Sequence, residues 1–276
     1  MQFMTNLHDS PLGHATTYAD AYDAALLFPV DRAPQREELG LGTGLPFRGF
    51  DVWNAYELSW LDPAGKPQVA IATFSVPAAS PRIVESKSVK LYLTAFNLSR
   101  FADAAAVGAA MARDLSGAAG APVDVALVRP HEFSALPYGE LQGEDLDVLP
   151  VTFDGSGPDA SLLVAAGPTA EQTLCTRLFR SLCPVTGQPD YASVQIHQRG
   201  NRLDPAGLLR YLVSYRSHPG FHEHCVERIF ADIWTRCRPQ ALTVYARFTR
   251  RGGVDINPWR TSDDSAPPPN RRTARQ

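Results

Sequence analysis

The 276-residue sequence lacks the features that mark membrane proteins, nucleic-acid-binding proteins and secreted proteins. No run of apolar residues approaches the roughly 20 that a membrane-spanning helix needs. The N-terminal stretch has no basic segment followed by an apolar one, so we expect no signal peptide. The 26 Lys and Arg residues are outnumbered by 29 Asp and Glu residues, which leaves a net charge of −3 and no basic surface for a nucleic acid. We therefore expect a cytoplasmic protein whose partner is a small molecule.

Cysteine is scarce: the chain has four, all between positions 175 and 237. Cytoplasmic thiols stay reduced, so plain burial competes with metal binding and catalysis as their role. Cys175, Cys225 and Cys237 lie in helix-like stretches and are interpreted as packing residues. Cys183 directly precedes a proline and lies seven residues before Asp190, across the turn VTGQP. These residues alone leave three roles open for Cys183: a buried hydrophobe, a metal ligand, or a nucleophile with Asp190 as its proton partner.

The sequence contains an internal repeat. The stretch ELSWLDPAGKPQ (57–68) aligns without gaps on FRSLCPVTGQPD (179–190), so that a glycine and a proline of each turn coincide. Downstream, YLTAFNLSRFAD (92–103) matches YLVSYRSHPGFHE (211–223) with one inserted residue. The order and spacing of these matches indicate a tandem duplication.

Each half reads as strand, strand, helix, strand, which predicts an α+β protein of two modules with helices packed on one face of an antiparallel sheet. Apolar alternation predicts strands at 69–76, 89–96, 192–198 and 207–215, and an apolar stripe at every fourth residue predicts a helix at 221–237, whereas 101–115 and 169–179 are helix-like. The Gly- and Pro-rich stretch 136–161 reads as the connection. We expect modules at 1–150 and 151–262 and a disordered polar tail at 263–276.

The two halves differ in their reactive groups. The second half carries Cys183, Asp190 and His222 where the aligned positions of the first hold a leucine, a glutamine and an alanine. The first half carries Glu85, in the motif VESKS, where the second has Asp204. Each half therefore is expected to contribute a different part of one site.

These groups are suited to nucleophilic catalysis. A thiol attacks as its thiolate, a histidine can take the thiol proton, and a carboxylic acid can return a proton to the product. A zinc site is the alternative, since His222, His224 and Cys225 are possible ligands, but residues two apart on a helix diverge. The stretch TRRGG (249–253) is either a solvated strand end or a phosphate clamp.

Taken together, ESKSVKLYLTAFN, SLCPVTGQPDYAS, FHEHCVE and FTRRGGVDINPWR resemble the nitrile reductases of queuosine biosynthesis, the NADPH-dependent 7-cyano-7-deazaguanine reductases, in their two-module form. The resemblance covers the chain except its final tail. It implies the tunnelling fold, an antiparallel sheet with helices on one face that is related to GTP cyclohydrolase I. It also implies a homodimer, because members of this family associate so that sites form where modules meet.

The resemblance further implies the roles of the reactive residues. Cys183 would attack the substrate nitrile to form a covalent thioimide, Asp190 would donate a proton, and His222 would assist proton movement. Two NADPH molecules would be used per turnover, and no metal is expected. Substrate-binding positions would be Val84, Glu85, Ser86, Phe221, His222 and Glu223, and NADPH-contacting positions would be Ser86, Lys87, Arg251 and Gly252.

Two other functions are compatible with the same residues. One is a zinc-dependent purine or pterin cyclohydrolase on the same fold. The other is a non-catalytic purine-binding module in which Cys183 is only structural.

Overall fold

The computed structural model describes residues 21–276 except 43, 154 and 156, and the chain divides into two compact units. The first unit includes 51–136 and 250–255, and the second includes 37–50, 137–249 and 256–276. The repeat predicted a single boundary at residue 150. The compact units interleave in the sequence, because the strands at 48–61 and 254–261 each contribute residues to both.

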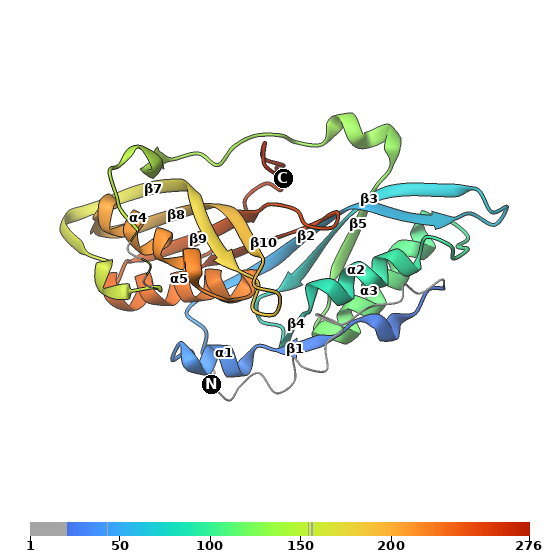
Figure 1. The fold of residues 1–276 in the computed structure, drawn as a ribbon, viewed down its shortest axis with the longest axis horizontal. Helices are drawn as coiled ribbons and strands as arrows, with labels where there is room; N and C mark the ends of the chain where they lie inside the picture. The colour runs from blue at the N-terminus through green and yellow to red at the C-terminus, as the bar shows by residue number, and fades with distance from the viewer. Residues whose placement is uncertain (1–20, 43, 154, 156) are drawn as a thin grey trace. The chain divides into compact units, whose positions relative to one another are not determined.

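The first unit packs two helices against one face of its strands (Figure 1). Its strands follow the order β5-β3-β2, and β5 runs antiparallel to β3 with Thr73 opposite Ala126. The core of this unit includes the fully buried rings of Trp53, Phe74 and Tyr92. Its elements are β1 (Pro29–Asp31), α1 (Ala33–Glu38, which continues into the second unit), β2 (Arg48–Leu61), β3 (Pro67–Pro77), β4 (Arg82–Val84), α2 (Ser86–Ala95), α3 (Ala104–Ala119) and β5 (Asp124–Val128).

The second unit repeats this plan, with two helices on one face of the strands β10-β9-β8-β7-β6 (Figure 1). Strands β7, β8 and β9 are antiparallel neighbours, with Val194 opposite Ala246. The apolar stripe predicted for the helix at 221–237 is confirmed, because Cys225, Ile229 and Ile233 are fully buried. The elements are β6 (Glu144–Asp145), β7 (Ala165–Leu182), β8 (Pro189–Leu203), α4 (Pro205–Val213), α5 (His222–Cys237), β9 (Ala241–Phe248) and β10 (Val254–Thr261).

Short 3-10 helices lie in the connections: η2 (Ala24–Leu26), η3 (Pro130–Ala135), η4 (Leu146–Val148), η5 (Ala160–Leu162) and η6 (Ser214–Ser217). Among the helices of the described chain, none is long and apolar enough to cross a membrane.

The α+β class, with antiparallel strands and helices on one face, is confirmed, and the repeat is visible in detail. Each unit runs strand, turn, strand, helix, helix, strand. In the first, Leu61 forms an isolated parallel bridge with Arg100, and in the second, Leu182 forms the same bridge with Pro219. The structural counterpart of Leu61 is therefore Leu182, not Cys183 as the gapless alignment paired it, so that alignment is shifted by one residue before the turn.

Three predicted elements were wrong in type. Residues 89–96 and 207–215 are not strands but lie largely in α2 and α4, whose first turns are capped by Glu85 and Asp204. Those side chains accept hydrogen bonds from two backbone N–H groups each, which fixes the helix start. The helix-like stretch 169–179 lies in β7, where pairing along the length of β8 overrides its local helix propensity.

The C-terminal part also differs from expectation. Strand β10 was not predicted, although all its residues are buried. The tail at 263–276, expected to be disordered, is placed against the second unit: Thr273 and Gln276 are each 3% exposed. A tail without large apolar residues is anchored here by hydrogen bonds, which the composition argument did not take into account.

Candidate active site

Cys183 lies in a turn that is fastened by backbone groups. Its N–H donates to the carbonyl of Gln188 at 2.8 Å, and its own carbonyl accepts from the N–H of Gly187 at 3.0 Å. Gly187 has a φ of 67°, which a residue with a Cβ rarely adopts. The preceding residue, Leu182, exchanges backbone hydrogen bonds with the segment before α5, donating to His218 and accepting from Gly220. The thiol therefore lies on a rigid support at the mouth of the β7–β8 hairpin.

Asp190 and His222 form a buried pair beside this hairpin. The carboxylate of Asp190, 4% exposed, lies 3.4 Å from Nε2 of His222 (Oδ2 to Nε2). The imidazole stacks on the ring of Phe248, with centroids 3.9 Å apart and planes 15° from parallel. Its Nδ1 is buried without a hydrogen-bond partner among the described residues. The ring is therefore held by one carboxylate and one aromatic face.

The strand register places Asp190 close to the turn that carries Cys183. Asp190 is the cross-strand partner of Ser181, and β7 ends one residue later, at Leu182, directly before Cys183. The predicted thiol, acid and imidazole therefore all lie in the second unit.

The other cysteines are poor nucleophiles. Burial raises the pKa of Cys225 to about 12 and also raises the pKa of Cys175 and Cys237. All four cysteines, Cys183 included, are buried, so burial by itself does not separate packing from catalysis. Cys183 is the cysteine that stands in a turn rather than inside a strand or helix.

The start of α5 supplies two further predicted residues. Phe221, half-buried, is the N-cap, and its carbonyl accepts from the N–H of Cys225 at 2.9 Å. Glu223, 3% exposed, lies in the first turn of the helix. The positive end of the helix dipole stabilises a carboxylate at that place, which offsets part of the cost of its burial.

In the first unit, Glu85 joins β4 to α2. Its carboxylate accepts hydrogen bonds from the N–H groups of Lys87 at 2.7 Å and Ser88 at 2.8 Å. Burial nevertheless raises the pKa of Glu85, which is 1% exposed. Val84, the last residue of β4, is buried, and Ser86 is half-buried. A carboxylate offers about four lone-pair sites, so Glu85 can accept further hydrogen bonds from a ligand.

Arg251 and Gly252 lie in the tight turn between β9 and β10, also in the first unit. Gly252 and Gly253 both have positive φ angles, 60° and 77°, and Arg251 exchanges backbone hydrogen bonds with Val254. A Cβ on Gly252 would lie 3.3 Å from the side chain of Lys90. A hollow of about 150 Å³ lies beneath, lined by Lys90, Gly252 and Gly253 together with Ala55, Glu57, Leu58, Leu93, Thr94, Asn97 and Val254. A cation, a glycine turn and polar side chains fit a phosphate-bearing cofactor.

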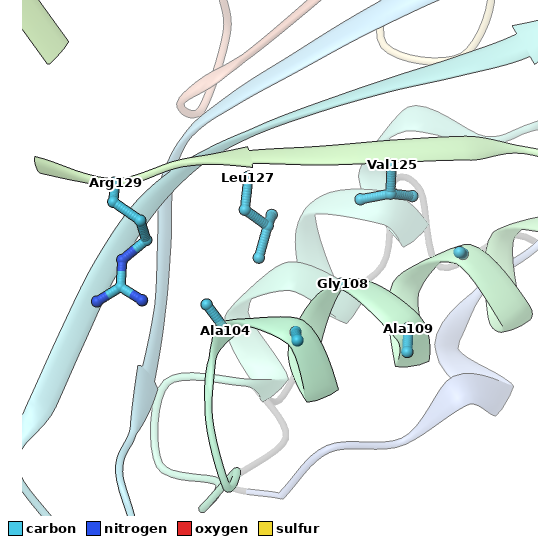
Figure 2. A pocket seen from close by; sticks show the side chains of 8 residues that line it. Ala104, Gly108, Ala109, Val125, Leu127 and Arg129 are labelled. Carbon is cyan, nitrogen blue, oxygen red and sulfur yellow. The ribbon is translucent and has the colours of Figure 1, made fainter. Parts of the chain in front are cut away.

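A larger hollow, about 430 Å³, lies between α3 and β5 in the same unit. Figure 2 shows Val125 and Leu127 projecting from β5 toward the small residues of α3, with Arg129 at one end. It contains none of the predicted site residues.

The zinc alternative finds no support in the geometry. Within the described ranges, no group of three or more His, Cys, Asp or Glu side chains is placed to hold a metal ion. Burial lowers the pKa of His224 to about 4, and its Nδ1 has no hydrogen-bond partner in the part of the chain that the structure describes.

Sequence reasoning missed Phe248 and Lys90. Phe248 ends β9, in which every residue except Thr243 is buried, so the apolar pattern predicts its burial but not its contact with His222. Lys90 lies in the motif ESKSVK, and its role becomes apparent only once 86–95 is a helix rather than a strand.

Comparison with known proteins adds independent information. A family model described as the N-terminal part of nitrile reductase, 7-cyano-7-deazaguanine reductase, matches residues 18–127, and one described as QueF-like protein matches residues 189–267. The NADPH-dependent 7-cyano-7-deazaguanine reductase of Burkholderia multivorans is 59% identical over 273 residues, covering 98% of this chain and all of the relative. The enzyme of the same name from Bordetella pertussis is 56% identical over 272 residues, with the same coverage.

The chain belongs to the NADPH-dependent 7-cyano-7-deazaguanine reductase family. The predicted family membership is thereby confirmed. Among solved structures, the apo form of the archaeosine synthase QueF-Like is 16% identical and has a TM-score of 0.31 over 37% of this chain and all of that chain. Membership in the reductase family rests on the full-length sequence relatives, and the tandem α+β modules of this member agree with it.

Proposed function

We propose that this chain reduces the nitrile of 7-cyano-7-deazaguanine to the aminomethyl group of 7-aminomethyl-7-deazaguanine in queuosine biosynthesis, with Cys183 as the nucleophile. The observation that supports this most strongly is the contact between His222, at the start of α5, and the buried Asp190 on the hairpin that carries Cys183. An acid and an imidazole in contact beside a thiol are what covalent capture of a nitrile needs.

In the first step the sulfur of Cys183 bonds to the nitrile carbon, and one π bond of the nitrile breaks. Asp190 donates a proton to the nitrile nitrogen, and the thiol proton passes to the Asp190–His222 pair, so that charge balances. The product is a thioimide. NADPH, when bound, supplies hydride, and two hydrides with two protons carry the four electrons that an aminomethyl product requires. Between the two reductions the Cys183 sulfur must leave the substrate carbon, and the Asp190–His222 pair again manages the protons.

Residues of both units are assigned to binding. Glu85 and Glu223, both buried carboxylates, would accept hydrogen bonds from the amino and ring N–H groups of the deazaguanine, and Phe221 would pack on its ring. Val84 would line the same substrate-binding site. A site lined by buried groups also keeps water from hydrolysing the thioimide.

Ser86, Lys87, Arg251 and Gly252 would hold the phosphate groups of NADPH. The glycine turn beside Lys90 supports this assignment, because the backbone there can approach an anion closely. No metal is part of the proposal. We also propose that the protein is a cytoplasmic homodimer that does not bind nucleic acid, consistent with its net charge of −3.

The test is an intact-mass measurement after incubation with 7-cyano-7-deazaguanine in the absence of NADPH. We expect a covalent adduct that disappears in Cys183→Ala and persists in Cys237→Ala, a matched loss of a buried thiol. A wild-type protein that forms no adduct and shows no substrate-dependent NADPH oxidation contradicts the mechanism. Stoichiometric zinc, with activity lost to a chelator, would favour the cyclohydrolase instead.

A further inference from the structure

The tail of the chain ends in a buried amide that is fully engaged with the second unit. Oε1 of Gln276 accepts from Nε of Arg247 at 2.8 Å. Its Nε2 donates to Oδ1 of Asn257 at 2.7 Å and to the carbonyl of Phe248 at 3.0 Å. Both polar atoms of the side chain therefore form hydrogen bonds, which connect the end of β9 to the middle of the neighbouring strand β10.

The tail also surrounds a buried charge. Arg247 is 2% exposed, and its Nη1 donates to Oδ1 of Asn270, another tail residue, at 2.6 Å. A second bond from Nη1 goes to the hydroxyl of Tyr245 at 2.9 Å. An unsatisfied buried N–H group costs free energy, and Nη2 of Arg247 already has no hydrogen-bond partner among the described residues. Removal of the tail amide would leave Nε of Arg247 without its partner as well.

These contacts of the tail are connected to the candidate active site through one residue, Phe248. Neighbouring residues of a strand point to opposite faces, so Arg247 faces the tail while the ring of Phe248 faces α5. That ring stacks on His222, which contacts Asp190. Phe248 is also the cross-strand partner of Ala192, two residues after Asp190. The amide of Gln276 thus fixes the backbone of the residue whose ring holds the imidazole.

We infer that Gln276 is a positioning residue for the reaction: its hydrogen bond to the Phe248 carbonyl sets the ring that orients His222 toward Asp190. The inference rests on the proposed function, because it assigns a purpose to the position of His222. It gives the tail a role in catalysis without contact with substrate or cofactor.

The experiment measures the rate of adduct formation with 7-cyano-7-deazaguanine, then kcat and the KM for NADPH. We expect Gln276→Ala to slow adduct formation and kcat by roughly 10-fold, as small misplacements of catalytic groups do, with the KM for NADPH unchanged. Arg271→Ala, an exposed change in the same tail, is the matched control and should behave as wild type.

Gln276→Glu separates positioning from mere stability. Glutamate still accepts from Arg247 but cannot donate to the Phe248 carbonyl, so we expect the melting temperature to recover while the rate stays low. Because the two effects act through one contact, Gln276→Glu combined with Phe248→Leu should be no slower than Phe248→Leu alone. Both comparisons remain informative if Gln276→Ala fails to fold.

The outcomes are distinguishable. A wild-type protein that forms no adduct overturns the proposed function, and this is tested before any variant. A wild-type adduct with equal rates in Gln276→Ala or in Gln276→Glu overturns the inference alone. Additive losses in the double variant overturn the route through Phe248.

Discussion

The buried ion pair between Glu227 of α5 and Arg260 of β10 gives the sharpest prediction about stability. Arg260 donates from Nη2 at 2.8 Å and from Nε at 3.1 Å, both to Oε1 of Glu227. The arginine side chain is fully buried and that of Glu227 is 4% exposed. Glu227→Gln keeps the shape of the side chain but leaves the guanidinium without its countercharge. Removal of one partner of such a pair costs about 3–5 kcal/mol.

That cost corresponds to a fall in melting temperature of roughly 10 °C, because 1 kcal/mol moves the midpoint by about 2–4 °C in a protein of 150–250 residues. Differential scanning calorimetry would measure it. Glu171→Gln removes a carboxylate from an exposed pair with His197 and should move the midpoint by less than about 1 °C. A double variant, Glu227→Met with Arg260→Met, should recover most of the loss, since apolar replacement of both charges is often neutral. A Glu227→Gln protein that melts with the Glu171→Gln control would refute the reasoning.

Two further predictions concern the cofactor turn and acid stability. Gly252→Ala places a Cβ at a φ of 60° and 3.3 Å from the Lys90 side chain. We expect it to lower the free energy of unfolding by about 1 kcal/mol and to raise the KM for NADPH, with an unchanged rate of adduct formation. An unchanged KM would contradict the cofactor assignment. Burial lowers the pKa of His218 and His224 from 6.5 to about 4. As the pH drops from 6.5 toward 4, the unfolded chain therefore binds protons before the folded one does, and stability falls. Urea midpoints at pH 7 and pH 5 should show this fall, and His224→Gln should reduce it.

The sequence was most informative where local chemistry decides the structure. The turns around Gly65 and Gly187 could be aligned because a positive φ and a following proline leave a readable pattern. The stripe on α5 was readable because its apolar residues recur at every fourth position, although charged residues such as Glu223 and Glu227 are buried on this helix too. Comparison of the two copies then isolated Cys183 and Asp190 as groups that only the second copy of a shared turn carries, and the structure places them on one hairpin.

The incorrect predictions share one physical cause. Tertiary contacts determine which residues are buried, so the apolar residues of an element no longer follow its helical or strand period. Helix α2 is buried on several faces, with Val89, Leu91 and Tyr92 all inside, so its apolar residues do not follow the period of a surface helix. Glu85 stands at the N-cap position of α2, but the family resemblance indicated a substrate-binding role for it instead. The contact between Phe248 and His222 joins residues far apart in sequence, and no pattern within one copy predicts it.

The way the Cys183 turn is fastened bears on how such an enzyme can diverge after duplication. Leu182 and its counterpart Leu61 are both held by pairs of main-chain hydrogen bonds, of 2.9 and 3.0 Å in one copy and 2.9 Å twice in the other. Peptide groups are the same whatever side chain follows, so a reactive residue can be lost from one copy without loss of the fold. Selection could then keep chemistry in one copy and let the other specialise in ligand recognition.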